Sequence, residues 1–101
     1  MHPKMADLYH IYIFPKPGVE REQVEEMMSL AVDWFRYHKN CYVVETTSDE
    51  NKWYERLSPL AEKGGHVFIC KFDTNHYHGW MSKKFWEWFQ GKLKPPAPPV
   101  R

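Results

Sequence analysis

The sequence lacks the features that mark secreted and membrane-spanning proteins. It has only two cysteines, Cys41 and Cys70. Because both fall in predicted strands, we expect two buried free thiols rather than a disulfide framework. No apolar run approaches the roughly 20 residues that a membrane-spanning helix needs, and residues 1–7 lack the apolar middle region of a secretory signal. The sequence therefore predicts a cytoplasmic protein with no membrane partner.

A large excess of either charge is also absent. The formal net charge is +1 at pH 7, so any binding to nucleic acid would need a local basic patch. At 101 residues the chain is long enough for one core and too short for two. Aromatic residues make up 17% of the chain, which is more than one core of this size is expected to need. We therefore expect some rings to face a partner.

Proline is concentrated at the C-terminal end. We predict a single domain over residues 1–93 and an extended, flexible tail over residues 94–101 (KPPAPPVR). Pro96, Pro99 and Arg101 have the spacing of a polyproline ligand, with a solvated terminus as the simpler interpretation. Met5 is a plausible native start, in which case residues 1–4 would be an added leader.

Apolar patterning predicts a strand and a helix in the first third of the chain. Aromatic and β-branched residues over 8–14 predict a strand that stops at Pro15 and at Pro17-Gly18. From Glu20 the chain begins with acidic side chains and then carries apolar ones at spacings of three and four, from Val24 to Phe35, which predicts a helix. Residues 34–37 could close this helix or form a short strand before a polar turn at 38–40, and we favour the strand.

Two further strands and two helices are predicted in the rest of the chain. Residues 41–47 predict a third strand and residues 66–73 a fourth. Between them, Ser48 is the predicted N-cap of a helix that Gly64-Gly65 terminates. Ser82 can cap a short terminal helix. The predicted buried faces of these two helices hold Trp53, Leu57 and Leu60 or Ala61 in the first, and Phe85, Trp86 and Phe89, with Trp88 beside them, in the second.

The predicted order, βαββαβ, is typical of the α+β ferredoxin-like fold, in which four antiparallel strands carry two helices on one face. In strand one, Ile11 and Ile13 alternate with Tyr12 and Phe14, so both faces of the sheet are apolar. The second face needs its own cover. Either the short aromatic C-terminal helix within residues 80–93 or a second copy of the chain can provide it, and we expect a homodimer.

Several short motifs are spread along the predicted strands, helices and turns. They are Pro17-Gly18, Trp34-x-x-Tyr37 leading into residues 43–47 (VVETT), Arg56-Leu57, and Tyr77-x-Gly79-Trp80 followed by Trp86-x-Trp88. In these motifs the chain resembles the SinR-like family of small prokaryotic proteins over most of residues 8–89. That family is distantly related to the small CRISPR-associated adaptation nuclease and to VapD-type toxin ribonucleases. The resemblance implies a ferredoxin-like fold and a mobile-element or defence setting, without implying one shared activity.

The chain departs from its nuclease relatives at one important position. In those relatives an Asp at the end of strand one is thought to hold a divalent metal for phosphodiester cleavage. Ile13 occupies that position here, followed by Phe14 and Pro15. Asp7 is the nearest acidic residue on the strand, about 20 Å from its far end by strand rise. A metal-dependent nuclease of that type is therefore disfavoured.

Cations and rings together offer a candidate surface for nucleic acid. Single-stranded nucleic acid is held by positive charge along the backbone and by stacking of bases on aromatic side chains. The alternative is that the rings belong to the core and the lysines are merely solvated. The candidate residues are Arg36, Tyr37, His38 and Lys39 on one turn, with Lys83 and Lys84 beside Trp80.

Two other groups of residues have the side chains that catalysis or metal binding requires. His76 and His78, with Asp73 and His66, offer ligand types for zinc, but their spacing matches no recognised zinc signature. A catalytic pair of His38 with Cys41 would need an exposed thiol, which the strand pattern does not favour. We therefore expect no metal site and no cofactor.

The sequence supports three hypotheses about function. The first is a non-catalytic, dimeric ferredoxin-like module that binds nucleic acid or protein. The second is a metal-independent ribonuclease that uses His10, His38, His76 or His78 as acid and base. The third is a structural subunit of a larger assembly.

Overall fold

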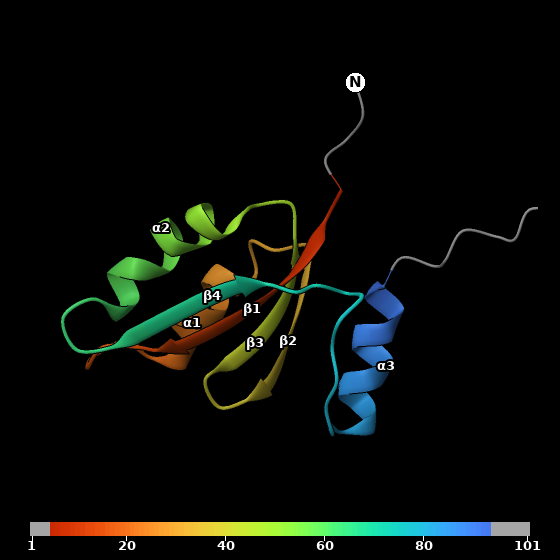
Figure 1. Ribbon diagram of the computed structural model, residues 1–101. Coiled ribbons are helices and arrows are strands. Elements are labelled where there is room, and N and C mark those ends of the chain that lie inside the picture. The colour runs from red at the N-terminus through yellow and green to blue at the C-terminus, as the bar shows by residue number, and fades with distance from the viewer. Residues whose placement is uncertain (1–4, 94–101) are drawn as a thin grey trace, which may run out of the picture.

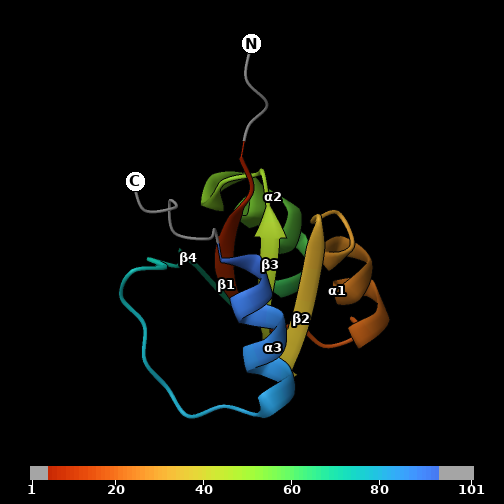
Figure 2. The same cartoon turned by 90° about the vertical axis from the view of Figure 1, so that its right-hand side faces the viewer.

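The structure is a computed structural model that describes residues 5–93, so the predicted Pro-rich tail and residues 1–4 lie outside the described part of the chain. It is an α+β arrangement with one antiparallel four-stranded sheet, as predicted, in the order β2-β3-β1-β4. Helices α1 and α2 lie against one face of the sheet and α3 against the other (Figures 1 and 2). The elements are β1 (Asp7–Phe14), α1 (Arg21–Met28), β2 (Asp33–His38), β3 (Cys41–Thr46), α2 (Glu50–Ala61), β4 (His66–Lys71) and α3 (Lys83–Lys92).

The main core lies between the sheet and the pair α1 and α2. Alternate residues of β1 point into it, because successive side chains of a strand face opposite sides. Ile11 and Ile13 are buried there, as the alternation predicted, against Trp53 and Leu57 of α2. The apolar face of α2 and the inward-facing side chains of β1 therefore pack together in one core.

A second, smaller core lies between the other face of the sheet and α3. Leu8 of β1 and Val43 of β3 are buried under Phe85 and Phe89 of α3. Two alternatives were predicted for covering this face, the aromatic C-terminal helix or a second copy of the chain. In the structure the chain's own helix α3 covers part of it. Figure 2 shows that α3 lies over β2 and β3 and leaves β4 uncovered on this side.

The structure confirms one of the two predicted helix caps and moves the other. Ser82 caps α3 by accepting a hydrogen bond from the Phe85 N–H at 3.2 Å, as predicted. The predicted N-cap of α2, Ser48, is wrong by one residue. Asp49 is the cap, and its carboxylate accepts the Lys52 N–H at 2.9 Å, whereas the Ser48 N–H donates to the Thr46 hydroxyl at 3.0 Å.

Short connections follow both helices of the main core. α1 ends at Met28 and β2 begins at Asp33, so residues 34–37 form a strand, which is the alternative that the prediction favoured. After α2, Gly64 has a φ of +134°. A Cβ on Gly65 would lie 2.2 Å from the Phe14 carbonyl oxygen, so this glycine allows the chain to pass the end of β1.

Both cysteines are free thiols, but the prediction that both are buried is wrong. Cys41 is half-buried and Cys70 is exposed. Cys70 lies on β4, on the same face of the sheet as α3, where it lines a cleft beside the helix. Among residues 5–93, no helix is long and apolar enough to cross a membrane.

Candidate functional site

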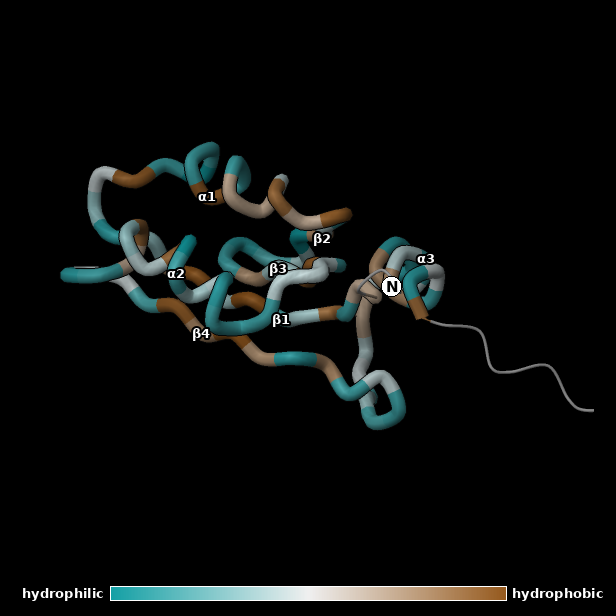
Figure 3. Tube along the Cα trace, turned by 90° about the horizontal axis from the view of Figure 1, so that it is seen from above, coloured by the Kyte–Doolittle hydropathy of each residue, from teal (hydrophilic) through white to brown (hydrophobic). Residues whose placement is uncertain are grey.

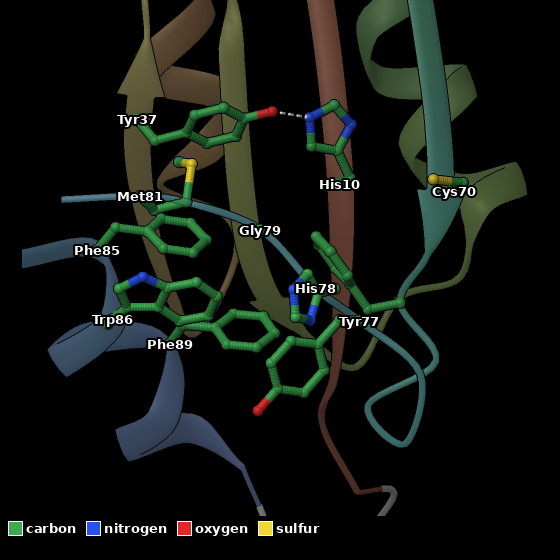
Figure 4. A pocket seen from close by; sticks show the side chains of 11 residues that line it. His10, Tyr37, Cys70, Tyr77, His78, Gly79, Met81, Phe85, Trp86 and Phe89 are labelled. Carbon is green, nitrogen blue, oxygen red and sulfur yellow. Dashed lines mark hydrogen bonds between the residues drawn. The ribbon is translucent and has the colours of Figure 1, made fainter. Parts of the chain in front are cut away.

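A cleft of about 290 Å³ lies where the second face of the sheet, α3 and the segment joining β4 to α3 meet (Figure 4). The sheet forms its base through β1, β2 and β4, and the helix and the joining segment form its walls. Its lining residues are His10, Tyr37, Cys70, Phe72, Tyr77, His78, Gly79, Met81, Phe85, Trp86 and Phe89. The volume is near the lower end of the range for small-molecule sites, and no lining residue carries a carboxylate.

Aromatic side chains on α3 and on the joining segment form the wall of the cleft. Tyr77 packs against Phe89 with ring centroids 5.0 Å apart and against Trp86 at 6.1 Å. Phe85 and Phe89, one turn apart on α3, stack at 5.5 Å with nearly parallel planes. Edge-to-face and offset contacts of this kind favour a fixed ring arrangement. The wall is therefore a continuous surface of packed aromatic rings.

A polar pair lies at the base of the cleft. The Nε2 atom of His10 on β1 is 2.5 Å from the hydroxyl oxygen of Tyr37 on β2, as Figure 4 shows. Burial lowers the pKa of His10. The pKa of Tyr37 is raised to about 12, mainly by burial and to a smaller extent by a hydrogen bond with Cys41. Near neutral pH the pair is therefore uncharged, and an uncharged imidazole offers one donor and one acceptor nitrogen.

The four predicted residues at the end of β2 do not form one surface. Arg36 points to the side of α1, where its Nε lies 3.7 Å from Glu25 Oε2. Tyr37 points the opposite way and is the only one of the four that lines the cleft. His38 and Lys39 are exposed where the strand ends, next to an irregularity in the β2–β3 pairing. The alternation of the strand sends Arg36 and Tyr37 to opposite faces of the sheet, whereas Arg36 and Lys39 line a common cleft of about 270 Å³ on the side of α1.

The other three predicted residues lie together at the start of α3. The Trp80 side chain is 99% exposed and follows Gly79, which lines the cleft. Lys83 and Lys84 occupy the first turn of α3 and are exposed. The Lys83 ammonium lies 3.8 Å from Glu87, a solvent-exposed pair that contributes little to stability. These residues flank the cleft without lining it.

The residues considered for metal binding are spread along β4 and the joining segment. His66 begins β4 and packs against Phe14, whereas Asp73 follows the other end of the strand. His78 lines the cleft, and the His76 N–H donates to the Asp73 carbonyl. No group of three His, Cys, Asp or Glu side chains within residues 5–93 is placed to hold a metal ion.

The position of the nuclease-type Asp is part of the main core. Ile13 is 1% exposed and packs on the helix side of the sheet. Asp7, at the start of β1, pairs with Lys71 at 3.5 Å. The end of β1 that follows Ile13 therefore has no carboxylate from this strand.

A charged cluster that sequence reasoning missed holds α3 in place. The Lys92 ammonium lies 2.8 Å from Asp33 and 3.2 Å from Glu45, and the Trp88 indole N–H donates to Asp33 at 3.0 Å. The cluster ties the last turn of α3 to β2 and β3, and so fixes the wall of the cleft. Asp33 and Lys92 are too far apart in the sequence for any local pattern to reveal the pair.

Comparison of the chain with family models, with curated proteins and with solved structures finds no match to any of them.

Proposed function

We propose that the protein is a non-catalytic binding module that holds single-stranded nucleic acid, with one base in the cleft. The observation that carries this proposal is a cleft that combines aromatic walls, an uncharged hydrogen-bonding pair and no carboxylate. Every base has a flat π face that stacks on aromatic side chains, and this contact tolerates any sequence. An apolar cleft without carboxylates also avoids repelling the phosphates that accompany the base.

The polar pair gives the base edge something to hydrogen-bond. His10 and Tyr37 are both neutral near pH 7, because burial disfavours the charged form of each: it lowers the pKa of His10 and raises the pKa of Tyr37. A base that replaces their mutual hydrogen bond can pair with the imidazole nitrogen and the hydroxyl. Unstacked bases in single strands expose these edges, whereas bases in a duplex do not.

Charge for the phosphates comes from the start of α3. Lys83 and Lys84 are exposed in the first turn of α3, directly before Phe85 and Trp86, which line the cleft. Because two lysines can neutralise only a few phosphates, we expect modest affinity and a shallow dependence on salt.

The fold and the family belong to the same proposal. We assign the chain to the ferredoxin-like fold, and support comes from the element order βαββαβ before α3 and from the sheet order β2-β3-β1-β4. The relationship to the SinR-like proteins rests on the sequence motifs alone and stays a prediction.

Fluorescence anisotropy tests the proposal. Labelled single-stranded RNA and DNA of about 12 nucleotides, within the size of known single-strand sites, are titrated with protein beside the matching duplex, at about 50 and 200 mM salt. We expect both single strands to bind, more weakly at the higher salt, and the duplex to bind much less.

A matched pair of tyrosine variants locates the site. Tyr77 lines the cleft, whereas Tyr54 is 59% exposed on α2. Tyr77→Ala is expected to weaken single-strand binding about 5- to 100-fold, the cost of one stacked base, and Tyr54→Ala to leave it unchanged. Absence of binding to every probe, or an equal loss in both variants, would contradict the proposal.

A second candidate function is metal-independent RNA cleavage, which one observation favours. His10 and His78 both line the cleft. One could take the proton of a ribose 2′-hydroxyl as its oxygen attacks phosphorus, and the other could protonate the departing 5′-oxygen. A gel of the RNA samples with chelator tests this. Cleavage lost in His10→Ala and His78→Ala but kept in His38→Ala and His76→Ala would establish it, and intact RNA would exclude it.

A further inference from the structure

The outer edge of β4 has unpaired backbone groups. The Phe72 N–H donates to the Leu8 carbonyl on β1 at 2.9 Å. In an antiparallel ladder the direction of the backbone groups alternates, so those of Val67, Ile69 and Lys71 point away from β1. No hydrogen bond within residues 5–93 uses these outward groups. β4 therefore presents a row of free donors and acceptors.

This edge lacks the features that normally keep sheet edges apart. Proteins protect edges with bulges, prolines or charged side chains. β2, the opposite edge, has an irregular pairing between Arg36 and His38, and Arg36 is exposed. β4 is regular over its whole pairing with β1, and residues 67–70 are uncharged. Figure 3 shows the hydrophobic middle of β4 at the margin of the molecule.

Exposed aromatic side chains accompany the free edge. Phe68 is 62% exposed on the face that α3 leaves open, and Tyr54 of α2 is 59% exposed. Tyr54, Val67, Phe68 and Ile69 line a groove between α2 and β4, together with Glu50 and Asn51 at the start of α2. Apolar surface on both sides of an open edge is a feature of strand-pairing interfaces.

We propose that β4 pairs with β4 of a second copy, antiparallel and centred on Phe68, and so joins the two sheets in a homodimer. In this register Val67 lies opposite the partner's Ile69, and the outward groups of both form about four backbone hydrogen bonds. Phe68 lies opposite the partner's Phe68 in a non-hydrogen-bonded pair, where side chains approach most closely.

The charge pattern of the strand indicates a second copy as the occupant. With this centre, Lys71 lies opposite the partner's Gly65, and His66 lies opposite the partner's Cys70. No cation faces a cation, so the strand is complementary to itself. A register centred on Ile69 would instead place Phe68 opposite the partner's Cys70 and lose the aromatic pair.

Molar mass measured across a concentration series tests the proposal. The wild-type protein is expected to approach the mass of two chains, and Phe68→Lys the mass of one chain throughout, because two lysines would then face each other. Val32→Lys is the matched control, since Val32 is 66% exposed just before β2, at the other edge, and it should behave as wild type. A wild-type mass of one chain throughout, or a Phe68→Lys dimer, would overturn the proposal.

An independent variant tests the register. With Cys41 and Cys70 changed to Ser, Phe68→Cys places one thiol at the proposed centre, where the Cα separation of a non-hydrogen-bonded pair suits a disulfide. We expect mild oxidation to give a covalent dimer from this variant and not from Val32→Cys in the same background. Equal cross-linking of the two, or none in either, would rule out pairing centred on Phe68.

Discussion

Thr46 connects α2 to the sheet through a buried hydrogen bond. Its hydroxyl oxygen accepts the Trp53 indole N–H at 3.1 Å, and both side chains are almost fully buried. Thr46→Val keeps the shape but leaves the indole N–H unsatisfied, which is expected to lower the free energy of unfolding by about 1–3 kcal/mol. Urea unfolding measures the loss. Thr46→Ser retains the hydroxyl, so it should lose clearly less than Thr46→Val.

Asp33 makes the stability of the protein depend on pH in the acid range. A hydrogen bond from Lys92 is the main reason that the pKa of this carboxyl lies below its usual value of 3.8. A lowered folded-state pKa stabilises the protein above the usual value, and the contribution is lost as the pH falls through the folded-state pKa. We expect Asp33→Asn to cost about 1 kcal/mol at pH 7, and the difference from wild type to shrink at pH values well below 3.8.

Urea unfolding of wild type and Asp33→Asn, monitored by circular dichroism at a series of pH values, would measure that difference in the free energy of unfolding. A gap between the two proteins that stayed constant from neutral to strongly acid pH would mean that Asp33 acts by packing and not by charge. The same experiment on Glu45→Gln shows how far the second carboxylate near Lys92 substitutes for the first.

α3 is held by a core separate from that of α1 and α2. Phe89 fills the second core, whereas Leu57 fills the main one. Phe89→Ala is therefore expected to release α3 locally, so that its amides lose protection from hydrogen exchange while those of β1 keep theirs. Leu57→Ala should reduce protection everywhere, because it lowers global stability by about 2–5 kcal/mol. Equal loss of protection in β1 for both variants would show that the two cores unfold together.

The elements that the sequence predicted best are those with strong local signals. Alternation in β1 and the Ser82 cap of α3 depend on neighbouring residues, and both were read correctly. The placement of two candidate residues was predicted less well, because Arg36 and Tyr37 were assigned to one turn although the strand sends them to opposite faces of the sheet. The cleft has His10 of β1 and Trp86 of α3 in one lining, and no local pattern in the sequence contains that arrangement.

On the scale of the whole molecule, the cleft and the β4 edge are separate features of one sheet. The cleft opens between the second face and α3, and the edge lies along the outer side of β4. Cys70 belongs to both β4 and the cleft lining, so a dimer formed through β4 would bring two clefts onto one continuous sheet surface. Two linked sites bind a long strand more tightly than one site does, provided that the strand spans both.

The length of the probe therefore separates the two proposals. Phe68→Lys is expected to bind a probe of about 12 nucleotides as wild type does, since each chain keeps its cleft, and to bind a probe of about 40 nucleotides at least tenfold more weakly, because the second site is lost. Tyr77→Ala should remain dimeric and lose affinity for both probes. Anisotropy on both probes, with molar mass measured on the same samples, checks each part. A Phe68→Lys monomer that bound the long probe as tightly as wild type would mean that the dimer has no part in binding.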